Sequence, residues 1–157
     1  MSRFTEILLV SPLADCKSWV IKKEFGYDVG KEGSGVTVDV PIGFMTDFAS
    51  IPRPLWVLLP KWGKYGNAAV IHDYCYWEQI RSRKESDSIF REAMEVLKVA
   101  KWKIFCMYWA VRLCGGFAWS GNSKKRKDVK NKVTLVLPEN SVETASSLRL
   151  QTQELIE

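Results

Sequence analysis

Two neighbouring segments carry the strongest structural signals of the chain: Tyr65-Gly-Asn-Ala-Ala-Val-Ile-His-Asp-Tyr-Cys-Tyr-Trp-Glu-Gln-Ile80 and, just after it, Ser82-Arg-Lys-Glu85. Apolar and aromatic side chains recur at helical spacing in the first segment, and His72 and Tyr76 lie four apart on one face. The second segment has the pattern of a capping box that begins a helix at Ser82. Together they predict two helices that are joined by a short turn and pack antiparallel.

The second predicted helix carries an acidic residue in its apolar stripe. It runs to about residue 99, and its buried positions are Asp87, Phe90, Met94 and Leu97. Inward spacing predicts that the Asp87 carboxylate meets His72 across the helix pair. A carboxylate on one imidazole nitrogen fixes the tautomer and leaves the other nitrogen as a base. The alternative is that Asp87, near the helix N-terminus, only helps the helix to start.

The sequence before this helix pair predicts β-strands. Runs rich in β-forming residues cover 5–10, 18–25 and 35–40, and the last alternates with Val36, Val38 and Val40 on one face. Beyond the pair, 101–113 predicts a further helix, which the glycines at 115 and 116 are expected to end. The fold class is therefore α+β, with a small N-terminal antiparallel sheet followed by three or four packed helices.

Composition changes near Gly121. The 157 residues are 46% hydrophobic, but all 19 aromatic residues lie before position 120. Residues 123–132 carry six Lys or Arg and one Asp. We therefore expect a globular α+β domain at 1–120 and a basic linker with a C-terminal tail at 121–157. The tail is expected to be mobile or ordered by a partner.

Charge and cysteine content narrow the class of protein. The net charge is +5, of which the first 120 residues contribute 16 − 13 = +3. This mild excess does not demand a nucleic-acid groove, so nucleic acid is not an expected partner, and the basic run after Gly121 is the weaker alternative. No apolar run reaches the length of a membrane span, and no secretory leader is recognised. Four cysteines without a CxxC pair predict buried free thiols in a reducing compartment.

A second polar cluster lies in Gly43-Phe-Met-Thr-Asp-Phe-Ala-Ser-Ile-Pro-Arg53. Asp47 stands there among apolar residues, and its carboxylate requires backbone N–H groups, a cation or Arg53 as a partner. One interpretation is that Asp47 caps the following turn through Ser50 or nearby N–H groups. The other interpretation gives Asp47 a role as a metal ligand or an active-site residue.

Several phrases resemble a small family of unknown function that is common in tailed phages and prophages. They are Val40-Pro-x-Gly-Phe-x-Thr-Asp-Phe-Ala-Ser-Ile-Pro-Arg53, Trp62-Gly-Lys-Tyr-Gly-Asn-Ala-Ala-Val-Ile-His-Asp-Tyr-x-Tyr76, Asp87-x-Ile-Phe90 and Tyr108-x-Ala-Val-Arg112. The resemblance covers most of residues 1–120 and implies a phage origin. It places the protein in the cytoplasm of the bacterial host, with association with the virion as an option.

A second resemblance concerns motifs only. His72-Asp73-x-Cys75-Tyr76 is similar to the helix signature of secreted phospholipase A2, and Ser86-Asp87-x-x-Phe90 resembles a stretch of the parvovirus capsid phospholipase domain. This similarity implies that His72 is the base, that Asp73 binds calcium and that Asp87 orients the histidine. Asp47 is the candidate for a second calcium ligand, because the glycine-rich calcium loop of those enzymes is missing. Tyr76 joins His72 and Asp87 as a catalytic candidate.

Two hypotheses follow from these residues. The first is a phage-encoded, calcium-dependent hydrolase of phospholipids or other esters. Its tryptophans at 102, 109 and 119 would lie near basic residues and suit an interfacial surface, although a core position is the favoured reading for them. The second is a non-enzymatic virion or tail component, or a host-interaction factor. In that case Asp47, His72, Asp73 and Asp87 form a buried structural network, and 121–157 contacts other virion proteins.

Overall fold

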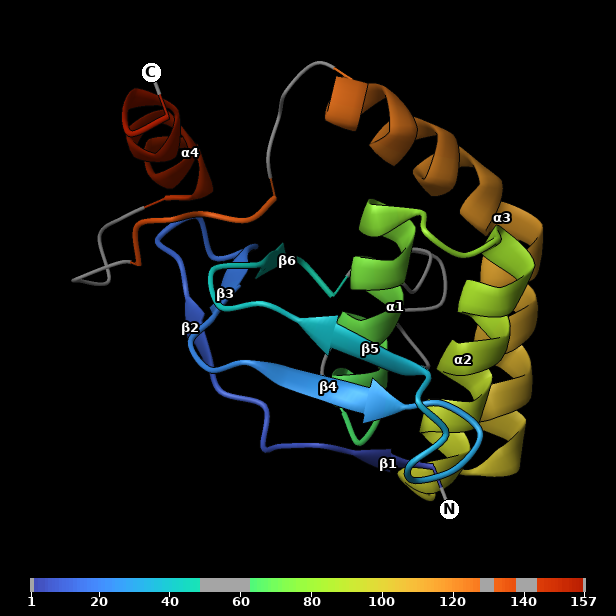
Figure 1. Cartoon of the computed structure of the whole chain (residues 1–157). Helices are drawn as coiled ribbons and strands as arrows, with labels where there is room; N and C mark the ends of the chain where they lie inside the picture. Colours follow the sequence, from blue (N-terminus) through green and yellow to red (C-terminus); the bar gives the residue numbers. More distant parts are fainter. Residues whose placement is uncertain (1, 49–62, 128–131, 138–143, 157) are drawn as a thin grey trace.

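The computed structural model describes residues 2–48, 63–127, 132–137 and 144–156 (Figure 1). Short strands come first, and helices follow, so the predicted α+β class is confirmed. The strands are β1 (Arg3–Phe4), β2 (Val10–Pro12), β3 (Trp19–Ile21), β4 (Phe25–Asp28), β5 (Thr37–Val40) and β6 (Met45–Thr46). The helices are α1 (Gly66–Glu78), α2 (Arg83–Val96), α3 (Lys101–Lys127) and α4 (Ala145–Glu154).

The strands form two antiparallel three-stranded sheets, with orders β1-β4-β5 and β2-β3-β6. In the β4–β5 hairpin, Phe25 pairs with Val40 and Tyr27 pairs with Val38, and all four side chains are buried. The predicted strand at 5–10 is not formed as one unit, because β1 ends before it at Phe4 and β2 begins only at its last residue, Val10. The side chains alternate as predicted, with Ile7 and Leu9 facing solvent and Leu8 and Val10 packed against the core, but residues 5–9 are not part of a strand.

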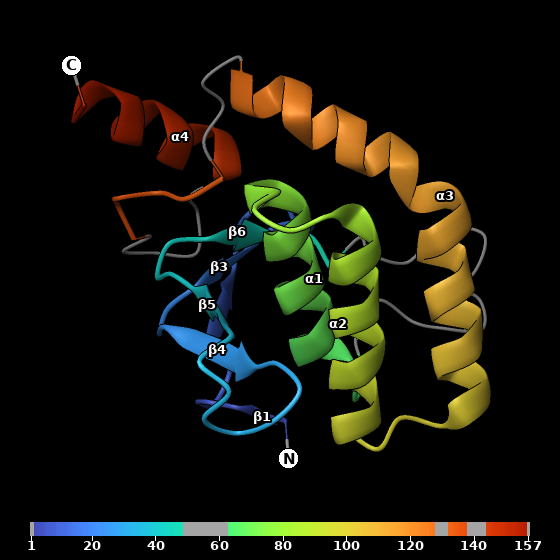
Figure 2. The same cartoon turned by 45° about the vertical axis from the view of Figure 1, so that its right-hand side comes forward.

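Helix α1 lies at the centre of the molecule, between the β4–β5 hairpin and the helices α2 and α3 (Figures 1 and 2). Ten of its 13 residues are buried, as its Ala-Ala-Val-Ile sequence favours. Helix α2 begins with the predicted capping box, in which the Ser82 hydroxyl accepts from Glu85 N–H and the Glu85 carboxylate accepts from Ser82 N–H. The predicted inward stripe is also present, since Asp87, Phe90 and Met94 are fully buried.

Helix α3 differs from its prediction. It does not end at the paired glycines but continues for another eleven residues after Gly116, to Lys127. Gly115 packs against the hydroxyl of Tyr76, where a Cβ would come within 2.5 Å of the oxygen. This glycine therefore serves close packing between α1 and α3 rather than chain reversal, which the sequence pattern alone does not distinguish. No helix among the described residues combines the length and the apolar character of a membrane span.

Segments beyond α3 contact the β2-β3-β6 sheet and the residues just before β6. Val133 forms a β-bridge with Phe44, and Thr134 N–H donates to the Gly43 carbonyl at 2.9 Å. On α4, Leu148 is fully buried in a small cluster with Leu13, Val20 and Met45. The described segments after α3 therefore pack on the N-terminal strands of the same chain, whereas residues 121–127 belong to α3.

Candidate functional site

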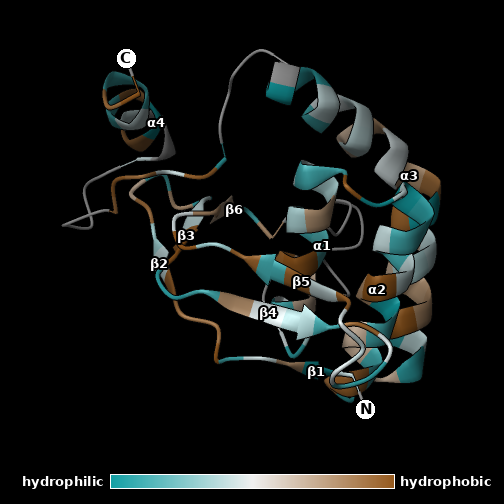
Figure 3. Cartoon of the chain, viewed as in Figure 1, coloured by the Kyte–Doolittle hydropathy of each residue, from teal (hydrophilic) through white to brown (hydrophobic). Residues whose placement is uncertain are grey.

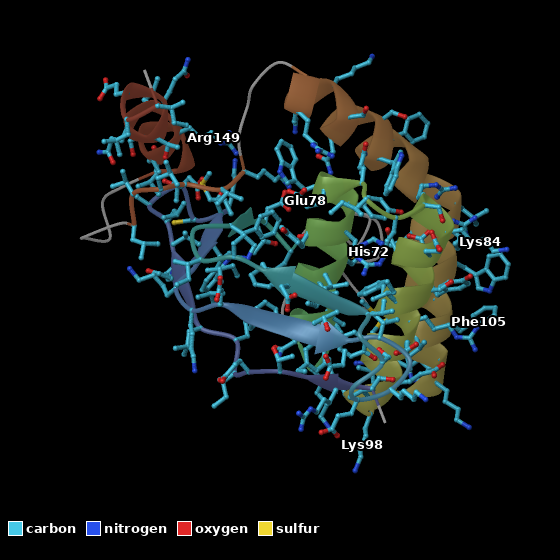
Figure 4. The ribbon with its side chains drawn as sticks, viewed as in Figure 1. His72, Glu78, Lys84, Lys98, Phe105 and Arg149 are labelled. Carbon is cyan, nitrogen blue, oxygen red and sulfur yellow. The ribbon has the colours of Figure 1, made fainter. Side chains whose placement is uncertain are left out.

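The core of the site is a contact between α1 and α2. His72 Nε2 lies 2.9 Å from Asp87 Oδ1, and the side chains are 2% and 0% exposed. Figure 4 labels His72 among the side chains between α1 and α2. The imidazole also packs against Phe90 and Tyr76, with ring centroids 4.6 and 4.1 Å away. The inward placement of both residues and their contact agree with the sequence prediction. The packing holds the imidazole in one orientation.

The Asp87 carboxylate also accepts hydrogen bonds from other side chains. The Tyr76 hydroxyl donates to Oδ1 at 2.6 Å, and Arg112 Nη1 donates to Oδ2 at 2.6 Å. Arg83 adds a second guanidinium, with Nη1 3.7 Å from Oδ2. A buried carboxylate is costly unless it is paired in this way.

These contacts determine the protonation of the cluster. Burial on its own would raise the pKa of Asp87, but the hydrogen bonds from His72, Tyr76 and Arg112 outweigh it and hold the pKa below its usual value. An ionised carboxylate only accepts, so His72 Nε2 donates to Asp87. A neutral imidazole that donates through Nε2 has its lone pair on Nδ1. Burial, then the hydrogen bond to Asp87 and the charge of that carboxylate, raise the pKa of Tyr76, which keeps its hydroxyl protonated as a donor.

Sequence reasoning did not assign Arg112 to the site. The sequence does contain a signal for Arg112, because it is the one charged residue between Ile104 and Trp119 in a strongly apolar segment. Position 112 lies on the flank of α3 that meets α2, where its guanidinium reaches Asp87. Arg83 also hydrogen-bonds the main-chain carbonyls of Val111 and Arg112, which ties α2 to α3.

A cavity of about 440 Å³ adjoins this cluster. Its walls come from α1, from the stretch of α3 between residues 110 and 125, and from the segment around β6. Four of the predicted site residues line it, namely Asp47, His72, Asp73 and Tyr76. Lys125 and Lys132 add positive charge to its lining. The cavity therefore combines an imidazole, two carboxylates and two ammonium groups.

The two carboxylates assigned to calcium differ in their surroundings. Asp73 is largely buried, and its Oδ2 accepts from the Thr46 hydroxyl at 2.6 Å. Asp47 is exposed at the cavity. Calcium takes about six to eight oxygen ligands, and the described residues contain no group of three or more His, Cys, Asp or Glu side chains that would hold a metal.

Two other predicted members of the polar cluster, Ser50 and Arg53, lie outside the described residues. The cysteine prediction needs correction. Only Cys75 is buried, whereas Cys16, Cys106 and Cys114 are exposed. The latter two lie on an apolar helix face that is not covered, which periodicity alone does not reveal.

Fold and site together define a small α+β protein with a buried histidine–aspartate–arginine cluster beside a polar cavity. The chain belongs to the family described as "Protein of unknown function (DUF1353)", whose model matches residues 19–111. This range includes β3 to α2 and the first part of α3. It contains His72, Asp73, Tyr76 and Asp87, and it ends one residue before Arg112.

A relative in Sinorhizobium fredii, described as "Uncharacterized protein y4jT", is 32% identical over 116 residues. The alignment covers 73% of this chain and 33% of the relative, so the chain spans about a third of that protein's length. No solved structure matches the chain.

Proposed function

We propose that the protein is a hydrolase that cleaves carboxylic esters of phospholipids, with His72 as its general base. The observation that carries the proposal is the 2.9 Å contact between His72 Nε2 and Asp87 at a cavity that also holds Asp47 and Asp73. An imidazole oriented by a buried carboxylate is a common solution for activating water. The similarity of His72-Asp73-x-Cys75-Tyr76 to phospholipase A2 supports the same reaction class.

The proposed reaction begins when Nδ1 of His72 takes a proton from a water molecule and the water oxygen bonds to the ester carbonyl carbon. Asp87 stabilises the imidazolium that forms, and Arg112 and Tyr76 keep Asp87 ionised. When the tetrahedral intermediate collapses, the bond to the alcohol oxygen breaks and His72 returns the proton to that oxygen. The ammonium groups of Lys125 and Lys132, which line the cavity, would stabilise the negative charge of the intermediate or of a phosphate group.

Lys132 is held in place by aromatic rings. Its Nζ lies 5.9 Å from the centroid of Phe44 and 5.8 Å from that of Trp77. Such contacts hold an ammonium group without neutralising it. Lys132 is therefore the better candidate for binding a substrate anion.

Calcium and phage origin belong to the same proposal. Calcium would bind at Asp73 and Asp47 and would supply Lewis-acid polarisation of the ester, and the similarity of the motifs supports it. The tailed-phage resemblance of residues 40–53 and 62–76 supports an origin in a phage or prophage. Expression would then place the protein in the cytoplasm of the bacterial host.

The test is hydrolysis of mixed phospholipid vesicles by the wild-type chain and by His72→Asn, purified in parallel. Circular dichroism and thermal unfolding establish that the variant is folded. We expect the rate to fall about 100-fold or more, the typical contribution of a general base. Assays with added calcium and with a chelator test the metal. Equal rates for the two proteins, or no hydrolysis of any ester by a folded wild type, would remove the hydrolase proposal.

One observation favours a non-enzymatic alternative. Asp87 is fully buried and receives hydrogen bonds from three side chains, an arrangement that also suits a purely structural network. Under this alternative the protein is a virion or tail component or a host-interaction factor. This alternative predicts that His72→Asn is strongly destabilised and that the wild type hydrolyses no ester. It also predicts that mass spectrometry detects the protein in purified phage particles.

A further inference from the structure

Helix α3 is apolar on two opposite sides. Ile104, Met107 and Val111 are buried against the rest of the molecule. On the other side the structure exposes a stripe of five large apolar residues, which we call the α3 stripe. It consists of Trp102, Phe105, Trp109, Leu113 and Phe117.

The stripe is continuous and strongly exposed. At about 100° per residue, its five side chains fall within a sector of about 120°. Leu113 and Phe117 are 77% and 88% exposed, and Phe105 projects outward from α3 in Figure 4. Figure 3 shows hydrophobic colour recurring along this helix. Scattered exposed apolar residues are normal, but an aligned row of this kind marks an interaction surface.

The charge of the helix indicates which surface it meets. Helix α3 contains seven Lys or Arg residues and no Asp or Glu. Lys101 and Lys103 flank the stripe at its start, and Lys103 Nζ lies 5.5 Å from the centroid of the Trp102 ring. Lys124 and Lys125 are exposed near its end. Glu95 of α2 also faces this region, but its carboxylate is paired with Arg91 at 3.1 Å.

We propose that the α3 stripe docks the protein onto the surface of an anionic lipid membrane. Tryptophan and phenylalanine would enter the boundary between headgroups and acyl chains, while the lysines would contact lipid phosphates. A helix with basic residues and no acidic ones has charge opposite to such a surface. A second copy of this chain would instead bring two equally basic helices together, which like-charge repulsion disfavours.

The position of the stripe relates it to the cavity. Phe117 belongs to the stripe and also lines the cavity that holds His72. Docking would therefore bring the lipid surface next to the cavity at Phe117. The docking proposal rests on exposure and charge alone, so it holds whether or not the cavity is catalytic.

The test is sedimentation of the full chain with sucrose-loaded vesicles made of ether-linked phospholipids, which contain no ester to hydrolyse. Vesicles of phosphatidylcholine alone are compared with vesicles that also contain phosphatidylglycerol. We expect binding to the anionic vesicles, weakened by added salt, with a blue shift of tryptophan fluorescence. Phe105→Ser combined with Leu113→Ser is expected to weaken binding at least about tenfold.

The matched control combines Ile7→Ser with Ile80→Ser, which removes two comparably exposed apolar side chains that lie outside α3. This control is expected to bind like the wild type. Equal binding by the α3 variant, or no binding to anionic vesicles, overturns the proposal. A dimer in light scattering that the α3 variant dissociates, without vesicle binding, would assign the stripe to a second copy. Binding to these vesicles without ester hydrolysis in the earlier assay would leave docking standing and remove only the hydrolase.

Discussion

Gly115 of α3 lies directly against the hydroxyl of Tyr76 of α1. A Cβ built on Gly115 would be 2.5 Å from the Tyr76 oxygen, whereas the neighbouring Gly116 has open space around it. The Tyr76 hydroxyl has little freedom to move, because it donates to the buried Asp87 carboxylate at 2.6 Å. The approach of the two helices and the polar cluster between them are therefore coupled through one glycine.

This coupling gives a pair of opposite effects. Gly116→Ala is expected to stabilise the fold by up to about 1 kcal/mol, because alanine favours the helical conformation. Gly115→Ala gains the same propensity but must displace Tyr76 or α3, so we expect a net loss of about 1–3 kcal/mol. Urea unfolding of both variants measures the difference. Equal stability of the two variants would show that α3 does not approach Tyr76 this closely in solution.

Arg112 is expected to contribute more to the stability of the fold than a partly exposed arginine usually does. Arg112→Leu keeps an apolar stem but leaves the buried Asp87 without its closest guanidinium, at a cost of about 1.5–3 kcal/mol. The control is Arg91→Leu, which breaks the exposed ion pair with Glu95 and should cost less than about 1 kcal/mol. Thermal and urea unfolding compare the two. A cost of Arg112→Leu no larger than that of the control would separate Arg112 from the cluster.

The lowered pKa of Asp87 predicts acid sensitivity. In the unfolded chain an aspartate titrates at about 3.9, and in the folded chain the pKa of Asp87 lies below that. Between the two values the unfolded chain binds more protons. The stabilisation is therefore complete above about pH 5 and is lost as the pH falls through the folded value.

Urea unfolding at a series of pH values tests this. We expect Asp87→Asn to be less stable than the wild type at pH 7 and to show a flatter fall in the free energy of unfolding below pH 5. Glu24→Gln, which removes an exposed carboxylate, controls for the loss of one charge. If Asp87→Asn keeps the full acid slope of the wild type, the carboxylate does not titrate as its contacts require.

Sequence patterns predicted the helix pair, the capping box and the contact of His72 with Asp87. They succeeded because each depends on local spacing: the cap acts within one turn, and inward positions follow from the helical period. Prediction failed where the answer depended on a distant neighbour. The end of α3 depended on whether Gly115 met Tyr76 or began a turn, and residues 5–10 depended on which strands were available to pair.

The polar site shows the same division. Asp87 could be placed from one helix alone, but its partner Arg112 is 25 residues away on a third element. Thr46, which donates to Asp73, is likewise 27 residues from it. The apolar outer side of α3 was interpreted as core, and only the tertiary structure shows that its tryptophans at 102 and 109 are exposed.

The four thiols are expected to separate into two classes. Burial raises the pKa of the Cys75 thiol to about 11, so it stays protonated and shielded. Cys16, Cys106 and Cys114 are exposed. A thiol-reactive chromogenic disulfide at pH 8 should therefore modify three thiols per chain quickly, and the fourth only after urea is added. Rapid reaction of all four in the native protein would contradict the buried position of Cys75 in α1.

The contact between the 132–134 segment and the strands can be tested through Gly43. Its φ is +84°, and a Cβ there would lie 2.0 Å from the carbonyl oxygen of Thr134. Gly33 has a similar φ of +72° with open space around it. Gly33→Ala therefore carries only the backbone strain, about 1 kcal/mol.

Gly43→Ala carries the same strain and also displaces the backbone of Thr134, so we expect it to cost at least about 1 kcal/mol more than Gly33→Ala. Displacement should also release the C-terminal segment. Limited proteolysis should then cut Gly43→Ala between residues 121 and 157 faster than either Gly33→Ala or the wild type. Equal stability and equal cleavage of the two variants would mean that the segment after α3 does not dock on the strands. The tail would then be mobile or ordered by a partner, which is what the sequence composition predicts.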